Sequence, residues 1–528
     1  MSASASAPPD PESSGSDAPS KKPITETLLP ALGFAALVCA VWYAYFKINT
    51  EAPPAEPKVV LPPVERPQTV VGTIFVPNPE HAWKQLRPFG SAAFGVYPTR
   101  ASTFITAGFG LPPYLDSEIR EDAPLVGAIA VDDRGTYWVL GAAVLDGRAL
   151  LAELTEGNEP YFFKEDHKDL GLTLVQPKPG RTPVALTLAI SGDMVLVAED
   201  DEQLLKLGPY VARNLPSAAE TKKKDIVVEL EPARLSKQVR ALVKTAPEFA
   251  LGWLSGIQHA SVSATIESDQ LSVSADLKLD AELRRVAQLF KPGPAGPLLS
   301  LSKSSAVSLL MQGLTDAGVV TRLADEPDDE KLKRGAQSLA DHTGPGITCM
   351  AEGSSGAGVL CQTPSDDGGK AAKALSDLAR LLGSPAWSER LRERTTIQVL
   401  PLAGAPTLPG LTTRSEALGD VAVAWRANEN ELLLALGTQP LPELSEQLSR
   451  WTPAEELLQS DKVVRGWFPA NTRVHAAVVL RPGQLLTTRA MAREEAALAI
   501  WLEPAASGVR VQLRAERDAI RFVTAAVR

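Results

Sequence analysis

Cys349 and Cys361 are two of the three cysteines in the chain, and a glycine- and serine-rich stretch, residues 353–358, lies between them. This spacing could serve a disulfide, a metal site or two free thiols. If the segment folds back about its centre, the two Cβ atoms lie about 4.5–5.5 Å apart, close to what a disulfide needs. A zinc site needs two further ligands, and none of the five histidines stands at ligand spacing from a cysteine. We therefore predict a Cys349–Cys361 disulfide and no metal site, with free thiols as the alternative.

Two other segments carry side chains that could do chemistry. Residues 164–169 (KEDHKD) combine acids with a histidine, but consecutive residues of this kind are typical of an exposed turn. Residues 368–373 (GGKAAK) lack the upstream glycine and the hydroxyl residue with which a P-loop holds phosphate and metal. No G-x-S-x-G, H-E-x-x-H or C-x-x-C motif occurs in the chain. We predict no catalytic residues and no cofactor, and an enzyme with an unrecognised site remains an alternative.

An aromatic and glycine-rich segment, residues 88–119, is the candidate binding site for an apolar ligand. Its composition is incompatible with one regular helix, and its aromatic side chains need cover from water. They could line an apolar groove formed by Phe89, Phe94, Phe104, Phe109 and Tyr114. The alternative is a hairpin with ordinary core aromatics and a loop.

The N-terminal part of the chain changes composition twice. Residues 1–27 begin with serine, alanine, proline and acids, which predicts a disordered tail. Residues 28–47 contain an uncharged run that is long enough, at about 1.5 Å per residue, to cross the hydrocarbon core of a bilayer as a helix. Residues 48–68 are rich in proline and predict a stiff, extended linker.

The flanks of this apolar run predict how it sits in a membrane. An acidic tail precedes the run and no small-x-small cleavage site follows it, so we expect an uncleaved anchor. Lys21 and Lys22 precede the span and only Lys47 directly follows it, which favours a cytoplasmic N-terminus. The layout suggests a bacterial inner-membrane protein with residues 48–528 in the periplasm. Such a compartment permits disulfides.

Residues 69–528 contain an internal repeat. Residues 184–206 and 421–443 both show an alternating strand, a polar turn, a second strand and the start of a helix. Residues 225–243 and 473–491 both show a strand followed by proline at the first helical position, where its missing N–H costs nothing. We infer an internal duplication.

The repeat bears on the cysteines as well. When residues 125–145 are aligned with residues 344–364, Cys349 and Cys361 fall on Ala130 and Ala142. Alanine at both places is typical of two facing, buried strand positions, and this supports the disulfide.

These patterns predict the α+β class. We expect one transmembrane helix followed by two pseudo-symmetric halves, residues 69–292 and 300–528, each with an antiparallel-rich sheet and helices on one face. Residues 293–299 are expected to be a linker, because proline and glycine dominate residues 291–297. Whether the halves are separate domains or one body is left open.

Two functions fit these features. The first is a non-enzymatic binding or scaffold module, anchored in the membrane by one span, with a protein partner in the envelope. The second is a periplasmic carrier of a lipid or small apolar ligand. Nucleic acid is not expected as a partner, because the chain has a net charge of −10 and offers no basic field.

Overall fold

The computed structural model of the protein describes residues 62–89, 98–156, 162–177, 186–235, 255–313, 330–351, 358–384, 387, 397–400, 409–415, 419–452, 454–485 and 495–526. The predicted tail, the predicted anchor and most of the predicted spacer lie outside these residues. Within them, no helix combines the length and the apolar character needed to cross a membrane.

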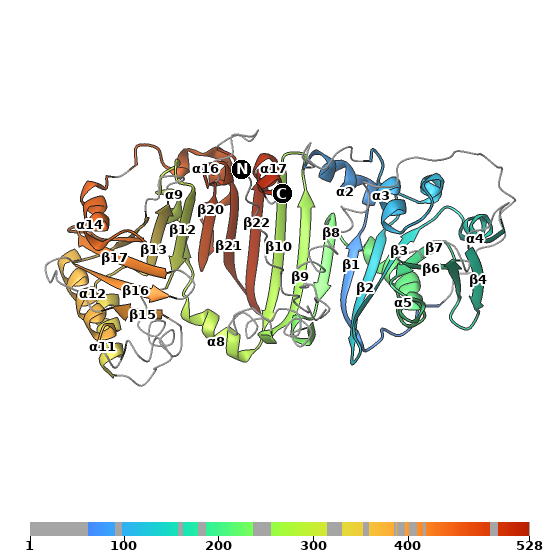
Figure 1. The fold of residues 1–528 in the computed structure, drawn as a ribbon, viewed down its shortest axis with the longest axis horizontal. Helices are drawn as coiled ribbons and strands as arrows, with labels where there is room; N and C mark the ends of the chain where they lie inside the picture. Colours follow the sequence, from blue (N-terminus) through green and yellow to red (C-terminus); the bar gives the residue numbers. More distant parts are fainter. Residues whose placement is uncertain are drawn as a thin grey trace, which may run out of the picture.

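Twenty strands form one sheet in the described part of the chain, and every pairing between neighbours is antiparallel (Figure 1). Ten of these strands come from the first half and lie in the order β4-β5-β6-β7-β3-β2-β1-β8-β9-β10. Their bounds are β1 Val70–Val76, β2 Leu125–Asp132, β3 Gly135–Ala143, β4 Phe162–His167, β5 Leu172–Pro177, β6 Thr187–Ser191, β7 Met194–Ala198, β8 Ile226–Leu230, β9 Ile257–Ile266 and β10 Gln270–Leu279.

The other ten strands continue the same sheet in the order β22-β21-β20-β12-β13-β14-β18-β17-β16-β15. Matched strand by strand in chain order, this is the order of the first half reversed. Their bounds are β12 Val307–Gln312, β13 Gly346–Ala351, β14 Val359–Pro364, β15 Ile397–Leu400, β16 Gly410–Ser415, β17 Gly419–Ala427, β18 Glu431–Gly437, β20 Ala476–Leu480, β21 Leu498–Ala505 and β22 Gly508–Glu516.

The two halves meet where β10 pairs with β22. The ladder runs from Gln270 opposite Glu516 to Lys278 opposite Gly508, with Ser274 opposite Gln512 at its centre. Ser274 is the fifth residue of β10 and Gln512 is the fifth residue of β22. A two-fold rotation about this centre therefore exchanges the two strands. The halves therefore form one continuous sheet, which answers the question that the sequence left open.

Helices cover both faces of the outer parts of the sheet, so the prediction of helices on one face is wrong. In β7, Val195 and Val197 pack with α3 (Ala101–Gly108) and α4 (Gly147–Glu156), whereas Leu196 packs with α5 (Asp201–Glu220) on the opposite face. The reason is that β7 (MVLVA) is apolar at consecutive positions, and consecutive residues point to opposite faces.

The second half repeats this two-sided cover. Leu432 packs with α12 (Gly368–Leu382), and Leu433 packs with α14 (Leu441–Arg450) on the other face. Helix α5 begins as its sequence predicts, since the Asp200 carboxylate caps the helix by accepting a hydrogen bond from the Gln203 amide at 2.8 Å. In the described residues, helices pack on a sheet whose pairings are all antiparallel, which confirms the α+β class.

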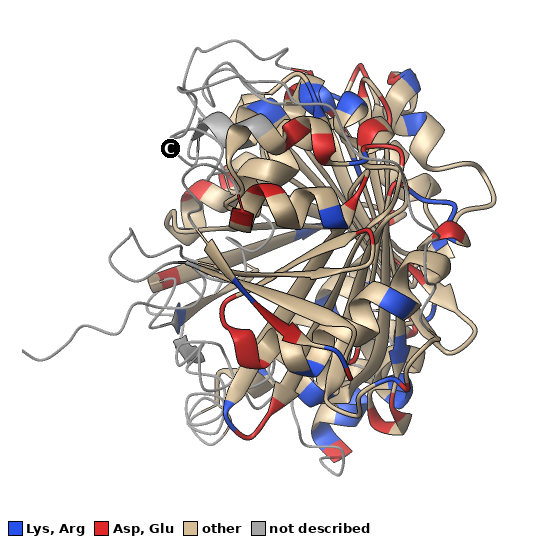
Figure 2. Cartoon of the chain, turned by 90° about the vertical axis from the view of Figure 1, so that its right-hand side faces the viewer, with Lys and Arg blue, Asp and Glu red and all other residues tan. Residues whose placement is uncertain are grey.

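The outermost strand of the first half corrects the interpretation of residues 164–169. Residues 164–167 belong to β4, and the turn follows at residues 168–171. Lys164, Glu165 and Asp166 are exposed on this edge strand, and Figure 2 shows the charges at this end of the molecule. Charged side chains on an edge strand oppose pairing with another chain. The cluster therefore protects the sheet edge.

The predicted linker, residues 293–299, is packed against the second half. Gly293 and Pro294 form β11, which pairs with β19 (Arg473–Val474), and Leu298 in the short helix α9 (Gly296–Leu299) is fully buried. The segment is thus part of the fold of the second half.

We expect Ser274→Pro to lower the free energy of unfolding by roughly 2–4 kcal/mol, since proline removes a ladder N–H in the middle of the sheet. Ser274→Thr keeps the N–H and is the matched control. Chemical denaturation of both variants measures the difference. Equal stability of the two variants would contradict the expectation that a ladder N–H at this place stabilises the sheet.

Candidate functional site

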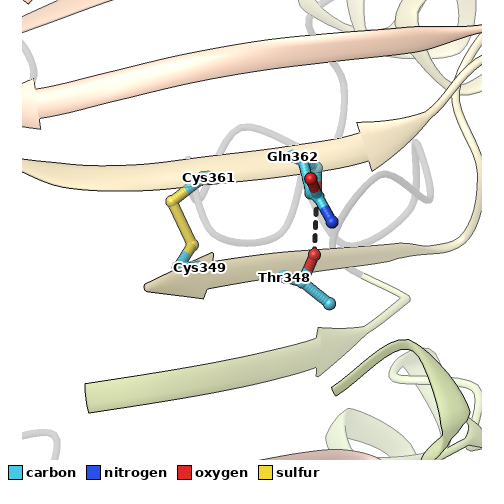
Figure 3. The surroundings of a disulfide bond; sticks show 4 residues. All are labelled: Thr348, Cys349, Cys361 and Gln362. Atoms are coloured by element: carbon cyan, nitrogen blue, oxygen red, sulfur yellow. Dashed lines mark hydrogen bonds between the residues drawn. A yellow bond between two sulfur atoms is a disulfide. The ribbon is translucent and has the colours of Figure 1, made fainter. Parts of the chain in front are cut away.

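The predicted cysteine pair lies on two neighbouring strands. Cys349 in β13 is directly opposite Cys361 in β14, with the Sγ atoms 2.12 Å and the Cα atoms 3.9 Å apart (Figure 3). Both side chains are buried, with 8% and 6% of their surface exposed. Beside them, the Thr348 hydroxyl donates a hydrogen bond to the Gln362 carbonyl at 3.3 Å. The pair is at disulfide distance in a structural position, away from solvent.

The predicted match of Cys349 and Cys361 with Ala130 and Ala142 is wrong. Ala130 lies opposite Tyr137, so Ala130 and Ala142 do not face each other. When the strands are matched by their ladders, the places of the cysteines are taken by Gly127 and Leu140, which do pair. The alignment of the two sequence segments was shifted at this place, because residue patterns do not show which residues pair across strands. The cysteine pair itself does not depend on it.

The five predicted groove residues do not gather around one open space in the described part. Phe89 is 6% exposed, and Phe109 is 4% exposed in a core cluster with Leu115 and Leu150. Phe104 lies against Trp83 instead, with the ring centroids 4.6 Å apart. Phe94 and the side chain of Tyr114 lie outside the described residues. Phe89 and Phe109 are therefore core aromatics, but residues 101–108 form helix α3 and not the hairpin of the alternative. The groove of five residues stays a prediction.

Shifted titratable groups are scattered over the described residues. Burial raises the pKa of Glu118, with smaller contributions from Glu153 and Asp146, and burial lowers the pKa of His475 at the other half. No group of three or more metal-ligating side chains occurs among the described residues. Neither observation indicates a catalytic centre in the described residues.

A different surface stands out, and the sequence analysis missed it. On the six strands around the junction, alternate residues form a face without a single polar side chain, which we call the aliphatic face. The strand ladders place them side by side. They are Ile226, Val228, Leu230, Ala260, Val262, Ala264, Ile266, Leu271, Val273, Ala275, Leu277, Ala476, Val478, Leu480, Leu498, Ile500, Leu502, Pro504, Val509, Val511, Leu513 and Ala515.

The opposite face of the central strands β9, β10 and β22 is polar. Ser263, Ser274 and Gln512 lie next to one another across the three strands. Arg510 and Asp276 pair across the junction, with Nε and Oδ1 2.6 Å apart. This contrast shows that the apolar character of the aliphatic face comes from strict alternation in these strands.

Most side chains of the aliphatic face are half-buried. Helix α8 (Ala281–Leu289) packs on one end through Leu283, which clusters with Leu279 and Val509. Helices α2 (Pro79–Leu86) and α17 (Arg517–Ala526) lie at the other end (Figure 1). Val273 and Val511 lie at the middle of the aliphatic face. Neither belongs to any of the core clusters in the described residues.

The size of the aliphatic face can be estimated from strand geometry. Six strands spaced about 4.8 Å apart span roughly 24 Å, and seven residues that each rise about 3.4 Å span roughly 20 Å. The aliphatic face thus has a plan area of about 500 Å². The exposed part of this area is smaller, because most of the side chains are half-buried. Contiguous exposed apolar patches of about 300 Å² or more on a single chain often mark a binding surface. The aliphatic face is therefore the candidate functional site.

Comparison with known proteins found no matching protein family and no matching curated protein. Two solved structures, described as crystal forms IV and III of TP0453, resemble part of the chain at 10% sequence identity. They cover 44% and 43% of this chain and 97% of their own chain, with TM-scores of 0.19 and 0.20. A likeness at these TM-scores carries no argument about fold or function.

Replacing both Cys349 and Cys361 by alanine should lower the free energy of unfolding by about 3 kcal/mol. A disulfide keeps a short loop closed in the unfolded chain, and its loss increases the conformational entropy of that chain. Cys39→Ala is the control and should leave stability unchanged. Denaturant titration with and without reductant measures this. A wild-type protein whose intact mass shows free thiols would contradict the disulfide.

Glu516 generates a prediction about pH. Burial raises its pKa, although its carboxylate accepts a hydrogen bond from the Ala497 amide at 2.8 Å. A carboxyl with a raised pKa favours the folded state below its ordinary pKa and loses that contribution as pH rises through the raised value. We expect Glu516→Gln, which cannot ionise, to gain stability relative to the wild type between about pH 4 and pH 7.

Urea titrations of both proteins at several pH values test this expectation. Glu267→Gln, at an exposed turn, is the control for removing a carboxyl group. A constant difference between wild type and Glu516→Gln across that range would contradict it.

Proposed function

We propose that the chain is a single-pass membrane-anchored protein of a bacterial envelope, and that its extracytoplasmic domain is a non-enzymatic binding module. The N-terminal composition supports the anchor, and the buried cysteine pair suits an oxidising compartment. The aliphatic face is the observation that carries the binding role, because it is a wide apolar surface on a rigid sheet.

We also propose that the two halves arose by duplication. The mirrored strand order supports this, and so does a pair of equivalent hydrogen bonds: the Glu231 amide donates to Val71, and the Arg481 amide donates to Ala306. In both halves the acceptor lies at the start of the first strand, Val71 within β1 and Ala306 directly before β12, and the donor is the residue that precedes a proline. Duplication would explain why the binding surface is built around a two-fold centre.

The proposal can be tested in the full chain by placing a photo-crosslinking amino acid at Val273 or Val511. Ser274 and Gln512 are the matched controls, because they lie on the same strands and point to the opposite face. We expect adducts from residues 273 and 511 in the membranes of the native host, and few from the controls.

Protease added outside the cytoplasmic membrane should also degrade residues 48–528 while a cytoplasmic marker survives. The absence of adducts from both faces would contradict the binding role. Protection of residues 48–528 from the protease would contradict the proposed topology.

A further inference from the structure

We infer that the aliphatic face binds the acyl chains of an anionic membrane phospholipid, with the headgroup at the exposed arginines of α8. This inference rests on the proposed binding role and names the ligand.

The chemistry of the aliphatic face favours a hydrocarbon ligand. Its side chains are aliphatic throughout, with no hydroxyl, amide, charge or aromatic ring, so they can offer a ligand no hydrogen bond. A polar ligand group that is buried there would lose its hydrogen bonds to water without replacement, which costs free energy. An extended peptide or loop brings N–H and C=O groups that the aliphatic face cannot pair, whereas a hydrocarbon chain brings none. The aliphatic face therefore suits a hydrocarbon chain, and among protein segments it suits only a helix, whose backbone groups are bonded within the helix.

The length of the aliphatic face also matches an acyl chain. The strands of the aliphatic face extend over about 20 Å, and each leaflet of a bilayer has a hydrocarbon depth of roughly 15 Å. An acyl chain thus fits along the strands. The burial of each CH₂ group of such a chain contributes about 0.8 kcal/mol.

Positive charge lies at one end of the aliphatic face. Helix α8 packs beside Leu277 and carries Arg284 and Arg285 on its exposed side. Arg284 donates to the Leu279 carbonyl at 3.1 Å, and Arg285 donates to the Ala281 carbonyl. Neither guanidinium lies within ion-pair distance of a carboxylate in the part of the chain that the structure describes. Both can therefore receive a phosphate group.

The other end of the aliphatic face differs. In α17, Arg517 donates to the Ser268 carbonyl at 3.2 Å, and Arg521 donates to the Pro88 carbonyl and lies 3.6 Å from Asp518. These arginines hold parts of the two halves together. The pseudo-symmetric surface therefore has one end that suits an anionic headgroup.

The test uses the full chain in phosphatidylcholine vesicles that contain phosphatidylglycerol with a photoreactive acyl chain. We expect labelling of peptides that cover residues 262–277 and 498–513, mapped by mass spectrometry. Photoreactive phosphatidylcholine is the matched neutral probe, and it should label these peptides at least about threefold less. Label confined to residues 28–47 would overturn the inference.

Two pairs of variants sharpen the result. Arg284→Glu with Arg285→Glu changes only exposed side chains, so it should preserve the fold and reduce phosphatidylglycerol labelling to the phosphatidylcholine level. Val273→Asp with Val511→Asp should abolish labelling, whereas Ser274→Asp with Gln512→Asp, on the opposite face, should not. Unchanged labelling in the arginine variant would overturn the headgroup assignment, and unchanged labelling in the valine variant would overturn the acyl site.

The two proposals can fail separately. If residues 273 and 511 cross-link to a protein while the lipid labels nothing on the aliphatic face, the binding module stands and the lipid ligand is wrong. If neither probe reacts there, both proposals are wrong.

Discussion

The ladder between β10 and β22 is the constraint on which the rest of the molecule depends. It joins two ten-strand halves edge to edge, with Ser274 opposite Gln512 at the centre of the pairing. Each of these strands would otherwise be an exposed edge with unpaired N–H and C=O groups, which is a site for aggregation. Pairing satisfies both edges at once. It also brings the six strands of the aliphatic face into one plane, so neither half contains that surface by itself.

The two faces of the sheet follow from where apolar residues alternate and where they do not. In β7, apolar residues are consecutive, and helices must cover both faces. In β10 and β22, serine, arginine and glutamine alternate with aliphatic residues, and one face is polar. The physical cause is the same in both places, because successive side chains of a strand point in opposite directions. The change from two-sided to one-sided apolar strands makes the centre of the sheet different from its ends.

Hydrophobic burial explains why the aliphatic face calls for a ligand or a cover. A Val or Leu side chain contributes roughly 1.5–3 kcal/mol when it passes from exposure to full burial, and many of those on the aliphatic face are only half-buried. A ligand that covered them would recover part of that free energy. The same residues would be a liability in an aqueous compartment if nothing covered them. The buried cysteine pair, in contrast, lies within the fold and offers no reactive surface.

The sequence by itself determined the local elements. Alternation predicted the hairpins at residues 184–206 and 421–443, and the opposed places of Cys349 and Cys361 followed from a short turn. These depend on interactions between residues near each other in the chain. The pairing of β10 with β22 joins residues more than two hundred positions apart, and no local pattern specifies it. The aliphatic face, the position of the KEDH residues on an edge strand, and the two-sided helix cover were therefore decided by tertiary structure, because each depends on which strands become neighbours.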